Sequence, residues 1–168
     1  NTLKSPYCLP NDLHNRITYI ETSRGCPFNC SYCLASREKN IRYFNIDVVK
    51  DEILYLMKNG ARVFKFLDRT FNLNPKHSLD LFKFIVERHY PDTSFQFEIT
   101  GDILPIEIID YLNNNAPKHL IRFEIGIQST NILANKLVNR HQDLNKLFAN
   151  IKKINDGKVI DLHLDLIA

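Results

Sequence analysis

Apolar residues recur along this chain with two different periods, which predict five strands separated by helices. Short runs rich in apolar and β-branched residues are typical of strands, and we expect strands at residues 17–21, 63–67, 95–99, 120–127 and 159–166. Between them, apolar residues recur every three or four positions, as they do in amphipathic helices. Helices are expected at residues 47–58, 75–88 and 105–114, and one or two more between 131 and 155, broken near Arg140.

Residues typical of helix ends flank these segments. Asn45 or Asp47 is expected to cap the first helix, Asn74-Pro75 opens the second, and Gly60 and Gly157 are expected to stop the first and last. Strands that alternate with helices are typical of right-handed βα units around a parallel sheet. The sequence therefore predicts an α/β domain with no internal linker.

The predicted strands have one apolar and one polar face, although strands buried within a parallel sheet are usually apolar on both. In the fourth strand, Ile121, Phe123, Ile125 and Ile127 alternate with Arg122, Glu124, Gly126 and Gln128. The apolar face must pack against the helices. Charged groups enclosed on the other face would cost several kcal/mol each unless they were paired. We therefore expect the polar faces to line an open partial barrel that holds a polar ligand.

Four polar side chains stand at or near the ends of predicted strands, namely Asp68, Glu98, Gln128 and Asp165. Binding sites of parallel α/β folds lie at the carboxyl ends of the strands. A capping or ion-paired structural role is the alternative interpretation of each residue. Their common placement favours a binding site.

Three cysteines follow the first predicted strand at the spacing CxxxCxxC, as Cys26, Cys30 and Cys33. Thiolates favour iron–sulfur clusters, zinc and copper(I). Three thiolates from one loop can hold three irons of a cubane cluster and leave the fourth open, whereas clusters held by protein alone usually take four cysteines. The alternative is a binding module without redox activity, stabilised by zinc on these cysteines and Cys8, since structural zinc sites have four protein ligands.

The cysteine loop resembles that of the radical S-adenosylmethionine (radical SAM) enzymes. The resemblance implies a partial (β/α)6 TIM-like barrel over residues 17–168, truncated after about five strands, with residues 1–16 as an irregular lead-in. It also implies a 4Fe-4S cluster on the three cysteines, whose free iron binds the amino and carboxylate groups of SAM. Reductive cleavage of SAM to a 5′-deoxyadenosyl radical would then oxidise, methylate or rearrange a small-molecule substrate, with electrons from a donor such as flavodoxin or ferredoxin.

The same resemblance implies contacts between four residues and SAM. Tyr32 precedes the last cysteine, where the family has an aromatic residue near the adenine. The run that ends at Asp68 lies where the family contacts the SAM amino group, although the usual Gly-Gly-Glu is missing. Glu98 and Asp165 look like the acidic residues that contact the SAM ribose.

Two further motifs are similar to those of oxygen-independent coproporphyrinogen oxidase. The run ending in Gln128-Ser129 is similar to a Gly-Val-Gln run whose Gln contacts SAM, and Val138-Asn139-Arg140 to a Val-Asn-Arg whose Arg approaches the SAM carboxylate. The sequence of residues 21–33 is similar to that of the anaerobic magnesium-protoporphyrin monomethyl ester cyclase class. In that class a cobalamin-binding domain precedes the radical SAM domain. Cobalamin from such a domain is therefore expected. A methylthiotransferase with a second cluster is a related alternative.

Composition narrows the remaining possibilities. The 168 residues are 44% hydrophobic with a formal net charge of +3, and no basic tract supports nucleic-acid binding. No apolar run of about 18 residues and no signal-peptide pattern is present, so we expect no membrane span and a cytoplasmic location. The chain starts without Met and stops directly after a predicted strand, so we expect an excised part of a longer protein that is inactive alone.

Overall fold

Five parallel strands form one sheet whose spatial order follows the sequence, β1-β4-β5-β6-β7. The computed structural model describes residue 7 and residues 13–167, so Cys8 and most of the lead-in lie outside the described residues. The strands are β1 (Ile17–Ile20), β4 (Val63–Phe66), β5 (Ser94–Ile99), β6 (Ile121–Gln128) and β7 (Asp161–Leu166). All four pairings are parallel, which confirms the predicted α/β class and is consistent with a partial barrel.

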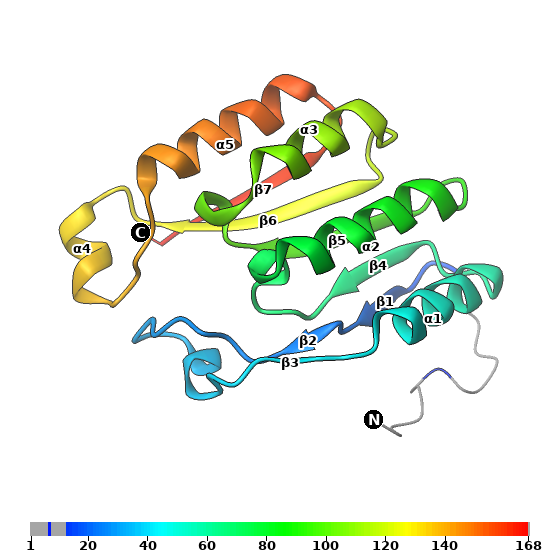
Figure 1. Ribbon diagram of the computed structural model, residues 1–168, viewed down its shortest axis with the longest axis horizontal. Coiled ribbons are helices and arrows are strands. Elements are labelled where there is room, and N and C mark those ends of the chain that lie inside the picture. Colours follow the sequence, from blue (N-terminus) through cyan, green and yellow to red (C-terminus); the bar gives the residue numbers. More distant parts are fainter. Residues whose placement is uncertain (1–6, 8–12, 168) are drawn as a thin grey trace.

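Helices connect these strands and cover one face of the sheet (Figure 1). They are α1 (Ile46–Lys58), α2 (Pro75–Arg88), α3 (Ile106–Asn115), α4 (Ile132–Leu137) and α5 (Leu144–Gly157). Four of them, α1, α2, α3 and α5, lie side by side, whereas the short α4 stands beyond the carboxyl end of β6 (Figure 1). The predicted break near Arg140 is confirmed, because this residue lies between α4 and α5.

Helix ends follow the predicted capping chemistry at three of four positions. The Asn45 side chain accepts a hydrogen bond from the amide of Asp47 at 2.9 Å, and Asn74 caps α2 with Pro75 in its first turn. Gly60 stops α1 as predicted, because it directly follows the C-cap Asn59 and has a φ of +97°. The fourth expectation is corrected by one residue. Helix α5 includes Gly157, and the left-handed residue that ends it is Lys158 at φ +53°.

The core lies between the helices and the apolar face of the sheet. Phe97 of β5 is fully buried, and its ring centroid lies 4.3 Å from that of Phe66 and 4.5 Å from that of Phe71. The predicted alternation therefore holds for β5 and β6, whose apolar residues are buried. It fails at the end of β7, where the side chains of Leu164 and Leu166 are 42% and 65% exposed.

A short antiparallel ribbon, which the sequence did not predict, brackets the cysteine loop. It pairs β2 (Ser23–Arg24) with β3 (Arg42–Tyr43), and the loop between them contains the 3-10 turn η1 (Leu34–Arg37). Two further 3-10 turns, η2 (Phe71–Leu73) and η3 (Gly101–Ile103), follow β4 and β5. Within the described residues, no helix is long and apolar enough to cross a membrane.

Candidate functional site

A cavity of about 340 Å³ lies between the cysteine loop and the carboxyl ends of the sheet strands. Eight of the nine residues predicted for the site line it: Cys26, Cys30, Tyr32, Cys33, Glu98, Gln128, Arg140 and Asp165. These residues come from segments far apart in the sequence. The structure therefore brings them together in one place, as the polar faces of the strands predicted.

The cysteines stand at one wall of this cavity as free thiols. Cys26 and Cys30 are buried, and Cys33 is half-buried. Backbone hydrogen bonds shape the loop, because the amide of Cys26 donates to the Glu38 carbonyl at 2.8 Å and that of Cys33 to the Cys30 carbonyl at 3.1 Å. In the described part of the chain, no three His, Cys, Asp or Glu side chains gather closely enough to hold a single metal ion.

The donor set is suited to an iron–sulfur cluster. Three soft sulfur ligands from one loop face a cavity, so a cluster held there would keep one side towards the cavity. The cavity is also lined by Glu98, Gln128 and Asp165. These polar side chains can bind a nucleoside that carries an amino-acid tail. The residues present thus fit both a cluster and a polar ligand beside it.

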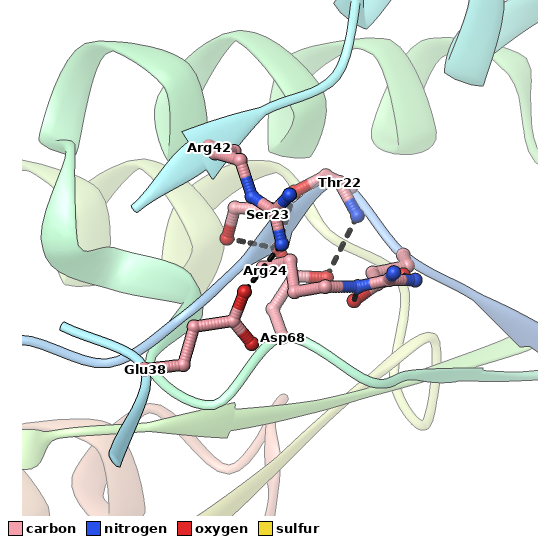
Figure 2. A network of polar contacts seen from close by, with 7 residues as sticks. Thr22, Ser23, Arg24, Glu38, Arg42 and Asp68 are labelled. Atoms are coloured by element: carbon pink, nitrogen blue, oxygen red, sulfur yellow. Dashed lines mark hydrogen bonds and ion pairs between the residues drawn. The ribbon is translucent and has the colours of Figure 1, made fainter. Parts of the chain in front are cut away.

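Asp68 is the one predicted site residue that does not line the cavity. Its carboxylate is fully buried and accepts hydrogen bonds from the Thr22 amide at 2.8 Å, the Thr22 hydroxyl at 2.6 Å and the Ser23 hydroxyl at 2.7 Å (Figure 2). Burial raises the pKa of Asp68, and these hydrogen bonds oppose the shift. The carboxylate therefore ties the start of the cysteine loop to the end of β4. Its contact with SAM stays a prediction.

Ion pairs on the outer side of the ribbon hold the loop further. Arg24 pairs with Glu21, and Arg42 pairs with Glu38, the residue whose carbonyl binds the amide of Cys26 (Figure 2). Both pairs are exposed, so each contributes little free energy on its own. The first pair lies before the three cysteines in the sequence and the second lies after them.

Arg140 lies closer to the cysteines than the sequence could show. Its guanidinium donates to the carbonyl of Gly126 at 2.7 Å and, through Nε, to Gln142 at 3.3 Å, and its Nη1 lies 4.0 Å from Cys30 Sγ. Helix α4 ends at Leu137, three residues before Arg140. The loop that follows α4 carries the side chain back over the end of β6.

Two side chains of the cavity have raised pKa values. Partial burial raises the pKa of Glu98; nearby Arg69 opposes the shift, whereas Glu124 adds to it. Burial and the neighbouring Cys30 raise the pKa of Tyr32 to about 12, so its phenol is neutral at physiological pH. A neutral aromatic ring at this position can pack against a heterocycle.

Ten further residues line the cavity that the sequence analysis did not single out as site residues, and five of them are Phe28, Arg69, Thr70, Glu124 and His163. A signal existed for three of these five. Glu124 and His163 belong to the polar faces of β6 and β7, and Arg69 directly follows the end of β4. Nothing in the sequence distinguishes Phe28 and Thr70 from core residues.

The family profile of the radical SAM superfamily matches residues 20–167, which is most of the chain. The chain belongs to the radical SAM superfamily. Members of this superfamily use a 4Fe-4S cluster and SAM, and they act on small-molecule substrates. Membership favours the cluster over the zinc-stabilised module as the interpretation of the three cysteines.

Similar proteins include both curated sequences and solved structures. An uncharacterized methyltransferase of Pyrococcus horikoshii, PH0819, is 40% identical over 65 residues, which are 37% of this chain and 14% of that protein. The radical SAM methyltransferase TsrM of Kitasatospora setae, solved with cobalamin and a [4Fe-4S] cluster, has a TM-score of 0.73 at 16% identity. Coproporphyrinogen III oxidase (HemN) of Escherichia coli has a TM-score of 0.62 at 19% identity.

The two structural likenesses cover nearly all of this chain, whereas the match to PH0819 covers about a third of it, and each covers only part of the relative. The matched region is 89% of this chain and 30% of TsrM, and 94% of this chain and 38% of HemN. At such identities the solved structures establish the fold. They agree with the predicted partial barrel of the radical SAM core.

Gly25 shows how the radical SAM loop depends on one residue. Its φ is +104°, and a Cβ atom there would lie 2.6 Å from the carbonyl oxygen of Asn40. Only glycine adopts this backbone readily, and the carbonyl belongs to the returning arm of the loop. The close approach of the two arms therefore requires a residue without a side chain.

Replacing Gly25 with alanine is expected to lower the unfolding free energy by at least about 1–2 kcal/mol and to reduce iron retention after anaerobic reconstitution. Gly60→Ala is the matched control, because φ there is +97° and the added Cβ meets the movable ring of His14 instead of backbone. Gly60 precedes the amino end of β4, so this variant should lose stability while keeping its iron. Equal iron contents in the two variants would contradict the role assigned to Gly25.

Proposed function

We propose that this chain is the core of an enzyme that reductively cleaves SAM at a 4Fe-4S cluster held by Cys26, Cys30 and Cys33. The observation that carries the proposal is the cavity itself. Its wall contains the three thiols, and its other sides contain polar side chains that the family resemblance identifies as SAM contacts. A structural zinc site would need no such cavity.

The bound cluster would supply one electron to the SAM sulfonium, whose S–C5′ bond breaks to give methionine and a 5′-deoxyadenosyl radical. The chain would bind and orient the reactants. Glu98 and Asp165 offer carboxylate oxygens to the ribose hydroxyls, and Gln128 offers an amide that can both donate and accept. Tyr32 would pack beside the adenine.

We further propose that Arg140 acts at the junction of the cluster and SAM. Its charge lies beside the Cys30 sulfur, and two of its nitrogens are held by Gly126 and Gln142. A fixed cation at this position can attract the SAM carboxylate without losing its place in the loop. Asp68 would support the same loop from outside the cavity.

The reaction that follows SAM cleavage is proposed to be methyl transfer assisted by cobalamin. A second SAM molecule would give its methyl group to cobalamin and leave as S-adenosylhomocysteine, and the 5′-deoxyadenosyl radical would take the hydrogen atom that the methyl group replaces on the substrate. TsrM binds cobalamin and is a methyltransferase, and PH0819 is named as a methyltransferase. Residues 17–168 would then be the radical SAM core, and cobalamin would be bound by a further domain. A small redox protein of the flavodoxin or ferredoxin type would supply electrons in the cytoplasm, where thiols stay reduced.

The proposal is tested by product analysis on protein reconstituted anaerobically with iron and sulfide. With SAM and dithionite, we expect methionine and 5′-deoxyadenosine in equal amounts, and neither product without the reductant. Protein that carries a full cluster and binds SAM, yet releases neither product, would contradict the proposed reaction.

A further inference from the structure

The segment from Asp68 to Asn72 is fixed at both ends. Asp68 binds Thr22 and Ser23, as described above. Asn72 is 1% exposed, and its side chain donates to the Thr100 carbonyl at 2.8 Å and accepts from the Thr100 amide at 2.9 Å. One anchor therefore holds the segment to the cysteine loop and the other to the end of β5.

Between these anchors, Arg69 and Thr70 reach the cavity. Thr70 is buried, and its hydroxyl lies 3.9 Å from Cys26 Sγ. Arg69 is the residue before Thr70, so it also lies near the proposed cluster. Its backbone has little conformational freedom, because both ends of the short segment are fixed. Loss of freedom on binding is small for a group that is already positioned.

Arg69 differs from the other cations of the site in having no partner. It forms no hydrogen bond through its side chain and no ion pair within 4.0 Å among residues 13–167. By contrast, Arg140 is bound to Gly126 and Gln142, and Lys65 pairs with Glu124 at 3.2 Å. Burial raises the pKa of Glu98 and the charge of Arg69 acts to lower it, but the two side chains form no ion pair.

We propose that Arg69 is an anchor, in addition to Arg140, for a carboxylate on a molecule bound in the cavity. A guanidinium binds a carboxylate through two parallel hydrogen bonds, and its planar shape gives direction as well as charge. The inference rests on the proposed function for the identity of the cavity. Two molecules can supply the carboxylate: the amino-acid end of SAM, or the substrate beside it.

The first arm of the test measures dissociation constants on reconstituted protein for SAM and for decarboxylated SAM. Arg69→Gln is expected to weaken SAM binding about 10- to 100-fold, the effect of losing a charged hydrogen-bonded pair, and to leave decarboxylated SAM unaffected. Arg69→Lys should lie between. Arg122→Gln is the matched control, because Arg122 is exposed on the polar face of β6 but does not line the cavity.

The second arm applies if Arg69→Gln binds SAM as wild type does. Acetate, as a probe of a substrate carboxylate, is titrated into SAM-loaded protein at constant ionic strength while the unfolding temperature is followed. A saturable increase in wild type that is absent in Arg69→Gln would assign Arg69 to the substrate. No difference in either arm would overturn the inference.

The two proposals fail in different ways. Wild-type protein with a full cluster that binds no SAM would overturn the proposed function and the inference with it. Wild-type protein that binds SAM normally, with Arg69→Gln unchanged in both arms, would overturn the inference alone. Because Arg69 is exposed, the variant should fold as wild type does, which urea unfolding checks.

Discussion

Replacing Cys26, Cys30 or Cys33 with alanine is expected to reduce the iron bound after anaerobic reconstitution from about four atoms per chain to almost none. In the proposed site each thiolate is one of three protein ligands, and two ligands do not hold a cubane cluster against competing thiols in solution. Iron and acid-labile sulfide analysis measures the loss, together with the charge-transfer absorption of the cluster.

Cys8→Ser is the matched control for this series. The cluster requires only the three cysteines of the CxxxCxxC loop, so the variant should retain wild-type iron and sulfide. A closed zinc site with four cysteines predicts the opposite result. Loss of metal in Cys8→Ser, with zinc instead of iron in the wild type, would contradict the cluster.

Replacing Asp68 with alanine is expected to lower the unfolding free energy by about 3–5 kcal/mol, as removal of one partner from a buried charged network does. Three donors on Thr22 and Ser23 would lose their acceptor inside the protein, and each unsatisfied buried donor costs about 1–3 kcal/mol. Urea unfolding of the two proteins under anaerobic conditions measures the difference.

The variant Asp68→Asn tests how much of the stability comes from the hydrogen bonds, because it keeps the packing of the side chain. The amide keeps the shape of the carboxylate and one acceptor for the Thr22 amide, and the two hydroxyls can turn to accept from its NH2 group. The loss should therefore be about 1–2 kcal/mol. Equal losses in the alanine and asparagine variants would contradict the assignment of Asp68 to the support of the loop.

The alternation of strands and helices made the sheet predictable, because an apolar run and an amphipathic helix are both local sequence patterns. Asn74-Pro75, for example, marks the start of α2 within one residue. The β2–β3 ribbon was not predictable in this way. It pairs residues 23–24 with residues 42–43, and two residues per strand carry no apolar alternation.

The parity of residues along a strand explains which predicted site residues reached the cavity. Glu98 is out of phase with the buried Phe97, so its side chain leaves the core and enters the cavity. Asp68 is in phase with Phe64 and Phe66, which face the helices, and it is buried on their side. The strand-end position and the resemblance to the family's loop near the SAM amino group placed Asp68 at the site, whereas parity predicts its burial.

Contacts made over long separations in the sequence were beyond prediction. The amide of Ser31 donates to the carbonyl of Val138 at 3.0 Å, which joins the cysteine loop to the end of α4. The same contact region places Arg140 beside Cys30. Neither arrangement follows from a periodic pattern, because both depend on how loops from different strands meet at the edge of the sheet.

The claim that one iron stays open for SAM is tested most directly by electron paramagnetic resonance of the reduced, reconstituted protein before and after SAM is added. Coordination of the SAM amino and carboxylate groups to the open iron should shift the g-values of the [4Fe-4S]⁺ signal. An unchanged spectrum in protein that equilibrium dialysis shows to be loaded with SAM would contradict the claim.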